Sequence, residues 1–222
     1  MAARKGITLS TKGVADDKRS RILHAAMEIF REHGFAATTT LEIATRARVS
    51  KRELYALVGN KQAMLIACIT ERAERLQVPA DTPVPRDRET LANVLAAFGT
   101  QLLREVSEPT VVAVFRLAIA EAIHAPQVAQ ALDSIGRETS RAALRQIMAR
   151  AQACGLLHGR PAELAEQFGA LLWCDLMLGL LLGVTERPSP RELGGRAHKA
   201  ATAFLQLHPT PSGAATSSAR LR

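Results

Sequence analysis

The chain has 222 residues, of which 47% are hydrophobic and 23% charged, so it buries a substantial core and is not disordered as a whole. Its formal net charge is +8, and the first 75 residues carry +6 of it, with 14 Lys and Arg against 8 Asp and Glu. A basic segment of this kind favours a polyanionic partner, either nucleic acid or an anionic membrane surface, and charge alone does not choose between them.

The N-terminal segment 1–17 is expected to be a flexible basic arm, because it lacks the continuous apolar stretch of a secretory signal. Helical apolar periodicity begins after it, whereas strand signals are few, so we predict an all-α fold. The first helix is expected over 18–33, with Ile22, Ala26, Ile29 and Phe30 on one stripe and an end at Gly34.

Two short helices are predicted next, over 39–47 and 50–58. Each opens with Thr or Ser followed three residues later by Glu, the pattern of a capping box, in Thr39/Glu42 and Ser50/Glu53. The short connection between them is typical of a helix-turn-helix. In the second helix the spacing places Leu54, Leu57 and Val58 toward a core, whereas Lys51, Arg52, Tyr55 and Ala56 share the opposite, exposed face.

Further helices are predicted over 61–76, 88–106, 109–124, 126–154, 161–184 and 190–207, about nine in all, and prolines stand at or near four of these starts. The run 110–115 (TVVAVF) looks strand-like, but its apolar pattern continues to Ile123 and favours a helix. Segment 168–184 is nearly all apolar, yet it is shorter than the roughly 20 residues of a membrane span and contains Asp175. We therefore expect no membrane insertion, and a disordered tail over 208–222.

The segment RILHAAMEIFREHGFAATTTLEIATRARVSKRELYALVGNKQAML resembles the N-terminal domain of TetR-family regulators across about 21–69. The motifs that carry the resemblance are A-x-x-x-F with H-G-F, T-x-x-x-I-A, V-S-x-x-x-L-Y and K-x-x-M-L. The chain departs from the family pattern at Arg48, where a glycine is usual, and at Val58, where a phenylalanine is usual. Since glycine adopts the turn conformation more cheaply than arginine, we expect a slightly altered turn at Arg48.

This resemblance implies a DNA-binding domain over 18–66, with its contacts chiefly to the DNA backbone. It assigns backbone contacts to Thr38, Thr39, Ser50, Lys51, Tyr55 and Lys61. It also brings Lys51, Arg52 and Ala56 near the bases, where a basic side chain suits guanine acceptors and a small one allows close approach. Glu53 is expected to cap its helix.

For residues 67–207 the resemblance implies an effector-binding and dimerisation domain. Helices 161–184 and 190–207 would pair with their copies in a homodimer of two-fold symmetry, which places two recognition helices on a palindromic operator. An unidentified small molecule would release this repressor from DNA. Seven residues are candidates for lining the effector pocket, with ordinary core packing as the alternative; they are Phe98, Leu102, Phe115, Ile119, Met148, Trp173 and Met177.

Other functions are less favoured by the sequence. The three cysteines are odd in number and widely spaced, which argues against a disulfide framework and for a cytoplasmic location. Cys154 and His158 supply fewer ligands than a metal site needs, so no metal or cofactor is expected. We find no nucleophile elbow, phosphate loop or dinucleotide fingerprint and predict no enzyme activity. A general nucleic-acid or membrane-surface coat protein using the basic arm is the second alternative.

Overall fold

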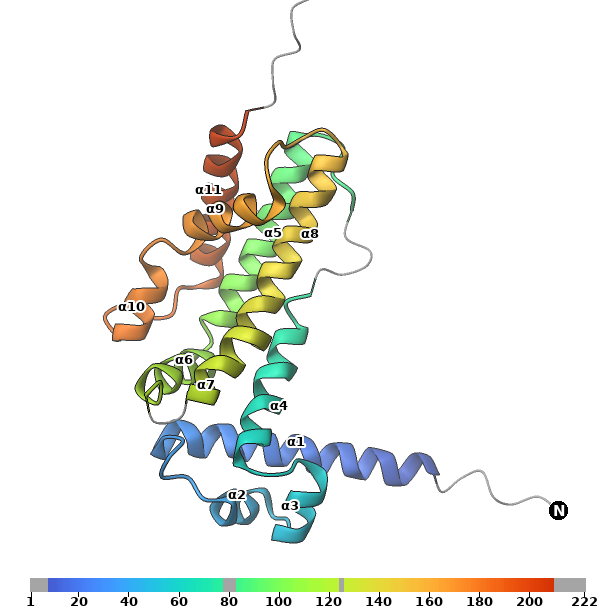
Figure 1. Ribbon diagram of the computed structural model, residues 1–222, viewed down its shortest axis with the longest axis vertical. Coiled ribbons are helices and arrows are strands. Elements are labelled where there is room, and N and C mark those ends of the chain that lie inside the picture. The colour runs from blue at the N-terminus through green and yellow to red at the C-terminus, as the bar shows by residue number, and fades with distance from the viewer. Residues whose placement is uncertain (1–7, 78–82, 124–125, 210–222) are drawn as a thin grey trace, which may run out of the picture. The chain divides into compact units, whose positions relative to one another are not determined.

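A computed structural model describes residues 8–77, 83–123 and 126–209 of the protein. Within these ranges every regular element is helical, and the strand-like run 110–115 lies inside a helix, as predicted (Figure 1). The chain forms two compact units, which are described separately. The first unit comprises the described residues up to 77 together with 105–140 and 178–187. The second unit comprises the described residues of 83–104, 141–177 and 188–209.

The first unit opens with α1 (Thr8–His33), α2 (Thr40–Ala47), α3 (Lys51–Leu57) and α4 (Lys61–Glu74). We expected α1 to begin near Lys18, but it begins at Thr8, so most of the expected arm is helical. Segment 8–17 contains no proline, and the single Gly13 is tolerated inside a helix at about 1 kcal/mol relative to alanine. The remainder of the predicted arm, 1–7, lies outside the described residues, as does the predicted tail from residue 210 onward.

The core of this unit contains the predicted stripe of α1, which is fully buried together with Leu54 of α3. It is larger than a three-helix core, because α6 (Pro109–Ala120), α7 (Pro126–Ala131) and the π-helical turn η1 (Leu132–Arg137) pack into the same cluster. Members of the cluster from outside the first three helices include Met64, Leu65, Val114, Val128 and Leu132. The predicted domain boundary at residue 66 therefore does not separate two cores.

The second unit is built on the packing of α5 (Arg88–Val106), α9 (Pro161–Trp173) and α11 (Pro190–Leu207). The rings of Phe168 and Phe204 meet edge to face with centroids 5.7 Å apart, and both side chains are fully buried. Gly99 lies so close to α9 and α11 that an added Cβ would be 3.0 Å from Leu172 Cδ1 and 3.3 Å from Ala197 Cβ. A side chain at this position would therefore be in tight contact with both helices.

Two predicted helices are interrupted. The segment predicted as one helix over 126–154 forms α7, η1 and α8 (Glu138–Ala153) without a break in the helical path. The segment predicted over 161–184 divides into α9 and α10 (Leu176–Leu182), because Cys174 adopts φ 44° and ψ −119°. The guanidinium of Arg196 donates to the Trp173 carbonyl oxygen at 3.2 Å and so satisfies an acceptor that a continuous helix would use.

The apolar character of this segment does not produce one long membrane-spanning helix. Among the described residues no single helix is long and apolar enough to cross a membrane, and only the bent pair α9 and α10, taken together, reaches the required length and composition.

Candidate nucleic-acid interface

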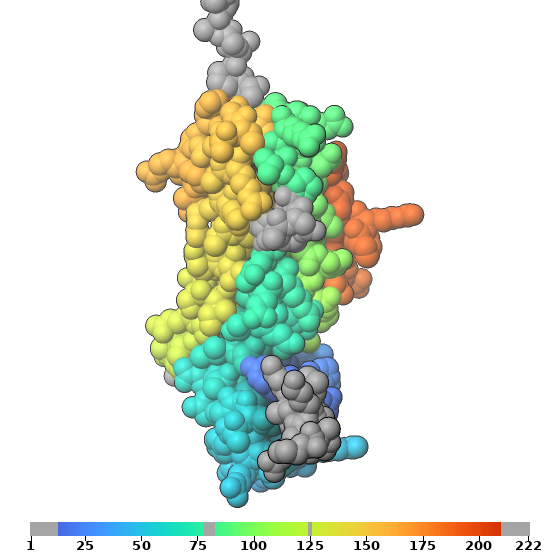
Figure 2. Space-filling model, turned by 90° about the vertical axis from the view of Figure 1, so that its right-hand side faces the viewer, coloured from blue at the N-terminus to red at the C-terminus, as the bar shows by residue number. Residues whose placement is uncertain are grey.

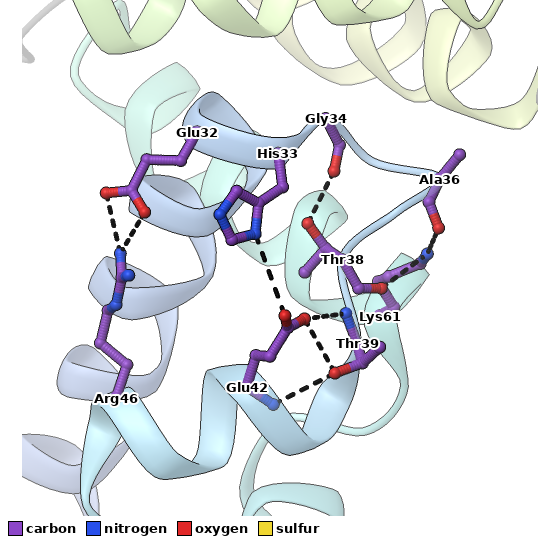
Figure 3. A network of polar contacts seen from close by, with 9 residues as sticks. All are labelled: Glu32, His33, Gly34, Ala36, Thr38, Thr39, Glu42, Arg46 and Lys61. Atoms are coloured by element: carbon purple, nitrogen blue, oxygen red, sulfur yellow. Dashed lines mark hydrogen bonds and ion pairs between the residues drawn. The ribbon is translucent and has the colours of Figure 1, made fainter.

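The N-terminus of α2 is fixed by the predicted capping box, which is confirmed (Figure 3). Thr39 Oγ1 accepts a hydrogen bond from the Glu42 amide at 3.2 Å, and the Glu42 carboxylate accepts from the Thr39 amide at 2.8 Å and from its hydroxyl at 2.9 Å. The hydrogen bonds from the Thr39 backbone and side chain lower the pKa of Glu42. The amides of Thr39 and Glu42, which have no carbonyl partner within the helix, are thereby satisfied.

The N-terminus of α3 carries the second predicted capping box, also confirmed. Ser50 Oγ accepts from the Glu53 amide at 3.1 Å, and the Glu53 carboxylate accepts from the Ser50 amide at 2.9 Å. The other carboxylate oxygen of Glu53 accepts a hydrogen bond from Lys18 Nζ of α1 at 2.6 Å. The hydrogen bond from Lys18, followed by those from Ser50, lowers the pKa of Glu53 to about 2. Glu53 is therefore ionised at neutral pH, and both of its oxygens are hydrogen bonded.

The turn between α2 and α3 contains the departure noted at Arg48. This residue adopts the left-handed conformation, with φ 54° and ψ 48°, which is a conformation that glycine adopts more cheaply. Its amide donates to the Thr45 carbonyl at 3.2 Å, and the Val49 amide donates to the Ala44 carbonyl at 3.0 Å. These bonds end α2 and redirect the chain into α3.

The outer face of α3 is formed by the four residues predicted to share it. Lys51, Arg52, Tyr55 and Ala56 are all exposed, whereas Leu54 has no exposed surface. Figure 2 shows the residues of α3, in cyan, on the surface of their unit. The Tyr55 hydroxyl lies 3.4 Å from the hydroxyl of Thr40, which links the first turn of α2 to this face. A short helix with two cations and a phenol pointing outward is therefore available to a polyanion.

Two of the residues predicted to contact DNA form hydrogen bonds within the protein in this structure. The Thr38 side chain is 3% exposed, and its hydroxyl donates to the Gly34 carbonyl at 2.6 Å. Lys61 Nζ donates to the carbonyls of Phe35 at 2.6 Å, Thr38 at 3.0 Å and Ala36 at 3.2 Å, and it lies 4.5 Å from the centroid of the Phe35 ring. In this conformation both side chains hold the loop between α1 and α2 (Figure 3).

Sequence analysis missed the polar contacts that join α1 to the two short helices. Arg46 Nη1 of α2 donates to both carboxylate oxygens of Glu32, at 2.9 and 2.8 Å (Figure 3). Lys18 of α1 pairs with Glu53 of α3. The partners are separated by 14 and 35 residues, and no local pattern reports such pairs. The one available signal was the opposite charge of residues on helices already predicted to pack together.

The predicted effector residues divide between the two units and are described in each. In the second unit Leu102 and Met148 are buried, whereas Phe98, Trp173 and Met177 are half-buried. In the first unit Phe115 packs against the core cluster, and Ile119 is 62% exposed. Burial of this kind suits core packing as well as the lining of a pocket, so the effector site stays a prediction.

Comparison with known proteins agrees with the geometry of this interface. Residues 22–68 match the family model described as "Bacterial regulatory proteins, tetR family", and residues 93–208 match "AefR-like transcriptional repressor, C-terminal domain". An HTH-type transcriptional regulator of Bacillus subtilis, YdeS, is 39% identical over 80 residues, which cover 36% of this chain and only 40% of YdeS.

Solved structures resemble the chain over most of its length. A TetR transcriptional regulator from Agrobacterium tumefaciens is 28% identical with a TM-score of 0.72, covering 87% of this chain and 95% of that one. The Flavonoid-responsive Regulator FrrA is 29% identical with a TM-score of 0.69, covering 88% of this chain and 98% of that one. One family model matches the helix-turn-helix segment, and the other matches residues 93–208, which make up more than half of the chain. This chain therefore belongs to the TetR family of DNA-binding transcriptional regulators.

Proposed function

We propose that the protein is a homodimeric repressor that binds a palindromic operator through α3 and leaves it when a small-molecule effector binds. The observation that carries this proposal is the outer face of α3, where Lys51, Arg52, Tyr55 and Ala56 are exposed on a helix anchored by the fully buried Leu54. A helix presented in this way suits the major groove of a duplex.

The roles of the contact residues follow from their chemistry. Lys51 and Arg52 carry the donors that match the N7 and O6 acceptors of guanine, and Ala56 allows the helix to approach the base edges closely. The hydroxyl of Tyr55 suits a contact to a phosphate oxygen, whereas the hydroxyls of Thr39 and Ser50 donate to Glu42 and Glu53 within their capping boxes and fix the two helix starts. Thr38 and Lys61 are left out of this direct set, because their polar atoms are engaged by carbonyls of the loop between α1 and α2. They act by positioning that loop.

The dimer is proposed to form through α9, α10 and α11, the segments 161–184 and 190–207 of the sequence prediction. In the second unit α9 and α11 pack against each other, with Phe168 and Phe204 at their contact. The opposite face of α11 is exposed at Gly195, where an added Cβ would meet nothing within 4 Å, so a second copy can approach closely. Light scattering coupled to gel filtration tests this part, and a monomer at micromolar concentration contradicts it.

The effector is proposed to bind in the C-terminal half, among the apolar residues of the second unit, and to act on DNA affinity through α4. The switch requires tighter effector binding to the DNA-incompetent state, with a coupling of about 1–3 kcal/mol. FrrA is flavonoid-responsive by name, so flavonoids are the first class to screen. Trp173 is the single tryptophan, so a change in intrinsic fluorescence reports binding near the end of α9.

A gel-shift assay with the DNA upstream of the protein's own gene tests the function as a whole. Selective binding is expected, with an affinity that falls as salt rises, because Lys and Arg contacts to phosphates release counterions. Equal binding to unrelated DNA of the same length contradicts the proposal and favours a general nucleic-acid coat.

A further inference from the structure

Glu53 is an unusual residue for the surface in which it lies. It belongs to the first turn of α3, directly after Lys51 and Arg52, whose side chains are exposed. The Glu53 side chain is itself 42% exposed. A carboxylate so close to a surface that binds phosphates repels the duplex, unless a cation compensates it.

Lys18 supplies that cation from a different helix. Its Nζ lies 2.6 Å from Glu53 Oε1, while Glu53 Oε2 accepts from the Ser50 amide and hydroxyl at 2.9 and 2.8 Å. The Lys18 side chain is 34% exposed, and its ammonium is in contact with the carboxylate. The pair is neutral as a whole, and the cations of α3 then act on DNA without an adjacent free negative charge.

The same contact also supports the orientation of α3. This helix has seven residues, and Leu54 is its one fully buried side chain within the described structure. A helix with so little buried surface is held largely by its ends. The N-terminal end is fixed by the Ser50 and Glu53 cap, and Lys18 ties that cap to α1.

We propose that Lys18 is a positioning residue for DNA binding: it neutralises Glu53 and ties the first turn of α3 to α1, and it does not itself contact DNA. This inference rests on the proposed function of α3. It explains why a glutamate is compatible with the DNA-facing helix of this chain.

The test is a double-mutant cycle on DNA affinity with the full-length protein. Lys18→Met is expected to weaken binding to the upstream DNA about tenfold, because Glu53 is left as an unpaired negative charge beside the duplex. The deficit is expected to shrink as salt rises, since the repulsion is screened. Adding Glu53→Gln to Lys18→Met is expected to restore affinity to within about threefold of Glu53→Gln alone, since the charge that needed compensation is gone. Lys18→Arg is expected to retain binding.

Arg19→Met is the matched control, because it removes one positive charge from the adjacent, exposed position of α1 without touching Glu53. Its effect is expected to add to that of Glu53→Gln without rescue. If Lys18→Met with Glu53→Gln binds as weakly as Lys18→Met alone, Lys18 contacts DNA itself and the proposal is wrong. Full affinity of Lys18→Met also contradicts it.

Two measurements keep these outcomes separate from other failures. Melting temperatures of all variants identify any that do not fold, and Lys18→Arg compared with Lys18→Met then tests the charge in a folded background. If the wild-type chain shows no preference for any upstream DNA, the proposed function of α3 fails. If the wild-type chain binds selectively and the cycle is additive, only the role of Lys18 fails.

Discussion

The left-handed conformation of Arg48 allows a quantitative prediction for Arg48→Gly. A residue with a Cβ pays about 1–2 kcal/mol in this conformation, and Arg48 adopts it with φ 54° and ψ 48°. Glycine avoids this penalty but loses about 0.5–1 kcal/mol through its greater freedom in the unfolded chain. The substitution is therefore expected to stabilise the protein by about 1 kcal/mol, which raises the melting temperature of a chain of this size by about 2–4 °C.

Arg48→Ala is the matched control for this prediction. It removes the same exposed guanidinium but keeps the Cβ, so the backbone penalty remains. Differential scanning calorimetry on both variants then isolates the conformational contribution. A melting temperature of Arg48→Gly no higher than that of Arg48→Ala would show that the turn is not strained in the way its dihedral angles imply.

Three further predictions test the packing and the titrating groups. Gly99→Val is expected to destabilise the protein by about 1–3 kcal/mol in chemical unfolding, because its first added carbon would already lie 3.0 Å from Leu172 Cδ1; an unchanged midpoint would contradict the close approach. Burial raises the pKa of the Cys68 thiol to about 12, so alkylation of native protein at pH 8, mapped by mass spectrometry, should spare Cys68 and modify the two exposed cysteines. Modification of all three at one rate would refute this assignment. The pKa of Glu53 is lowered from 4.5 to about 2, so its contribution to stability is complete above pH 4.5 and is lost as pH falls toward 2. Glu53→Gln should flatten the acid side of the stability curve measured by urea unfolding, and an identical curve for both proteins would count against it.

Local sequence signals predicted most of the first unit. Capping boxes at Thr39 and Ser50 mark helix starts because their hydrogen bonds join residues three apart, and both are present in the structure. The apolar stripe of α1 is buried for a similarly local reason, since helical spacing sets which residues share a face. The glycine that the family resemblance places at position 48 pointed to the left-handed conformation that Arg48 adopts.

Features that depend on distant residues could not be predicted in this way. The helix predicted over 161–184 breaks at Cys174. Next to this break the Trp173 carbonyl accepts a hydrogen bond from Arg196, which lies 23 residues later in the chain. The DNA contact of Lys61 stays a prediction, but the binding of its ammonium to carbonyls 23 to 26 residues earlier in the chain was not predicted. Periodicity and capping describe neighbours within one or two turns, whereas these contacts arise only when separate elements pack.

The selectivity of α3 for DNA is the central claim, and fluorescence anisotropy with labelled duplexes tests it most directly. The wild-type protein is expected to bind a fragment of the upstream DNA about 1,000-fold more tightly than a scrambled duplex of equal length and composition. Replacing Lys51 and Arg52 together by alanine should abolish this preference while the melting temperature stays close to the wild-type value. A double variant that still prefers the upstream fragment by the wild-type factor would contradict the account.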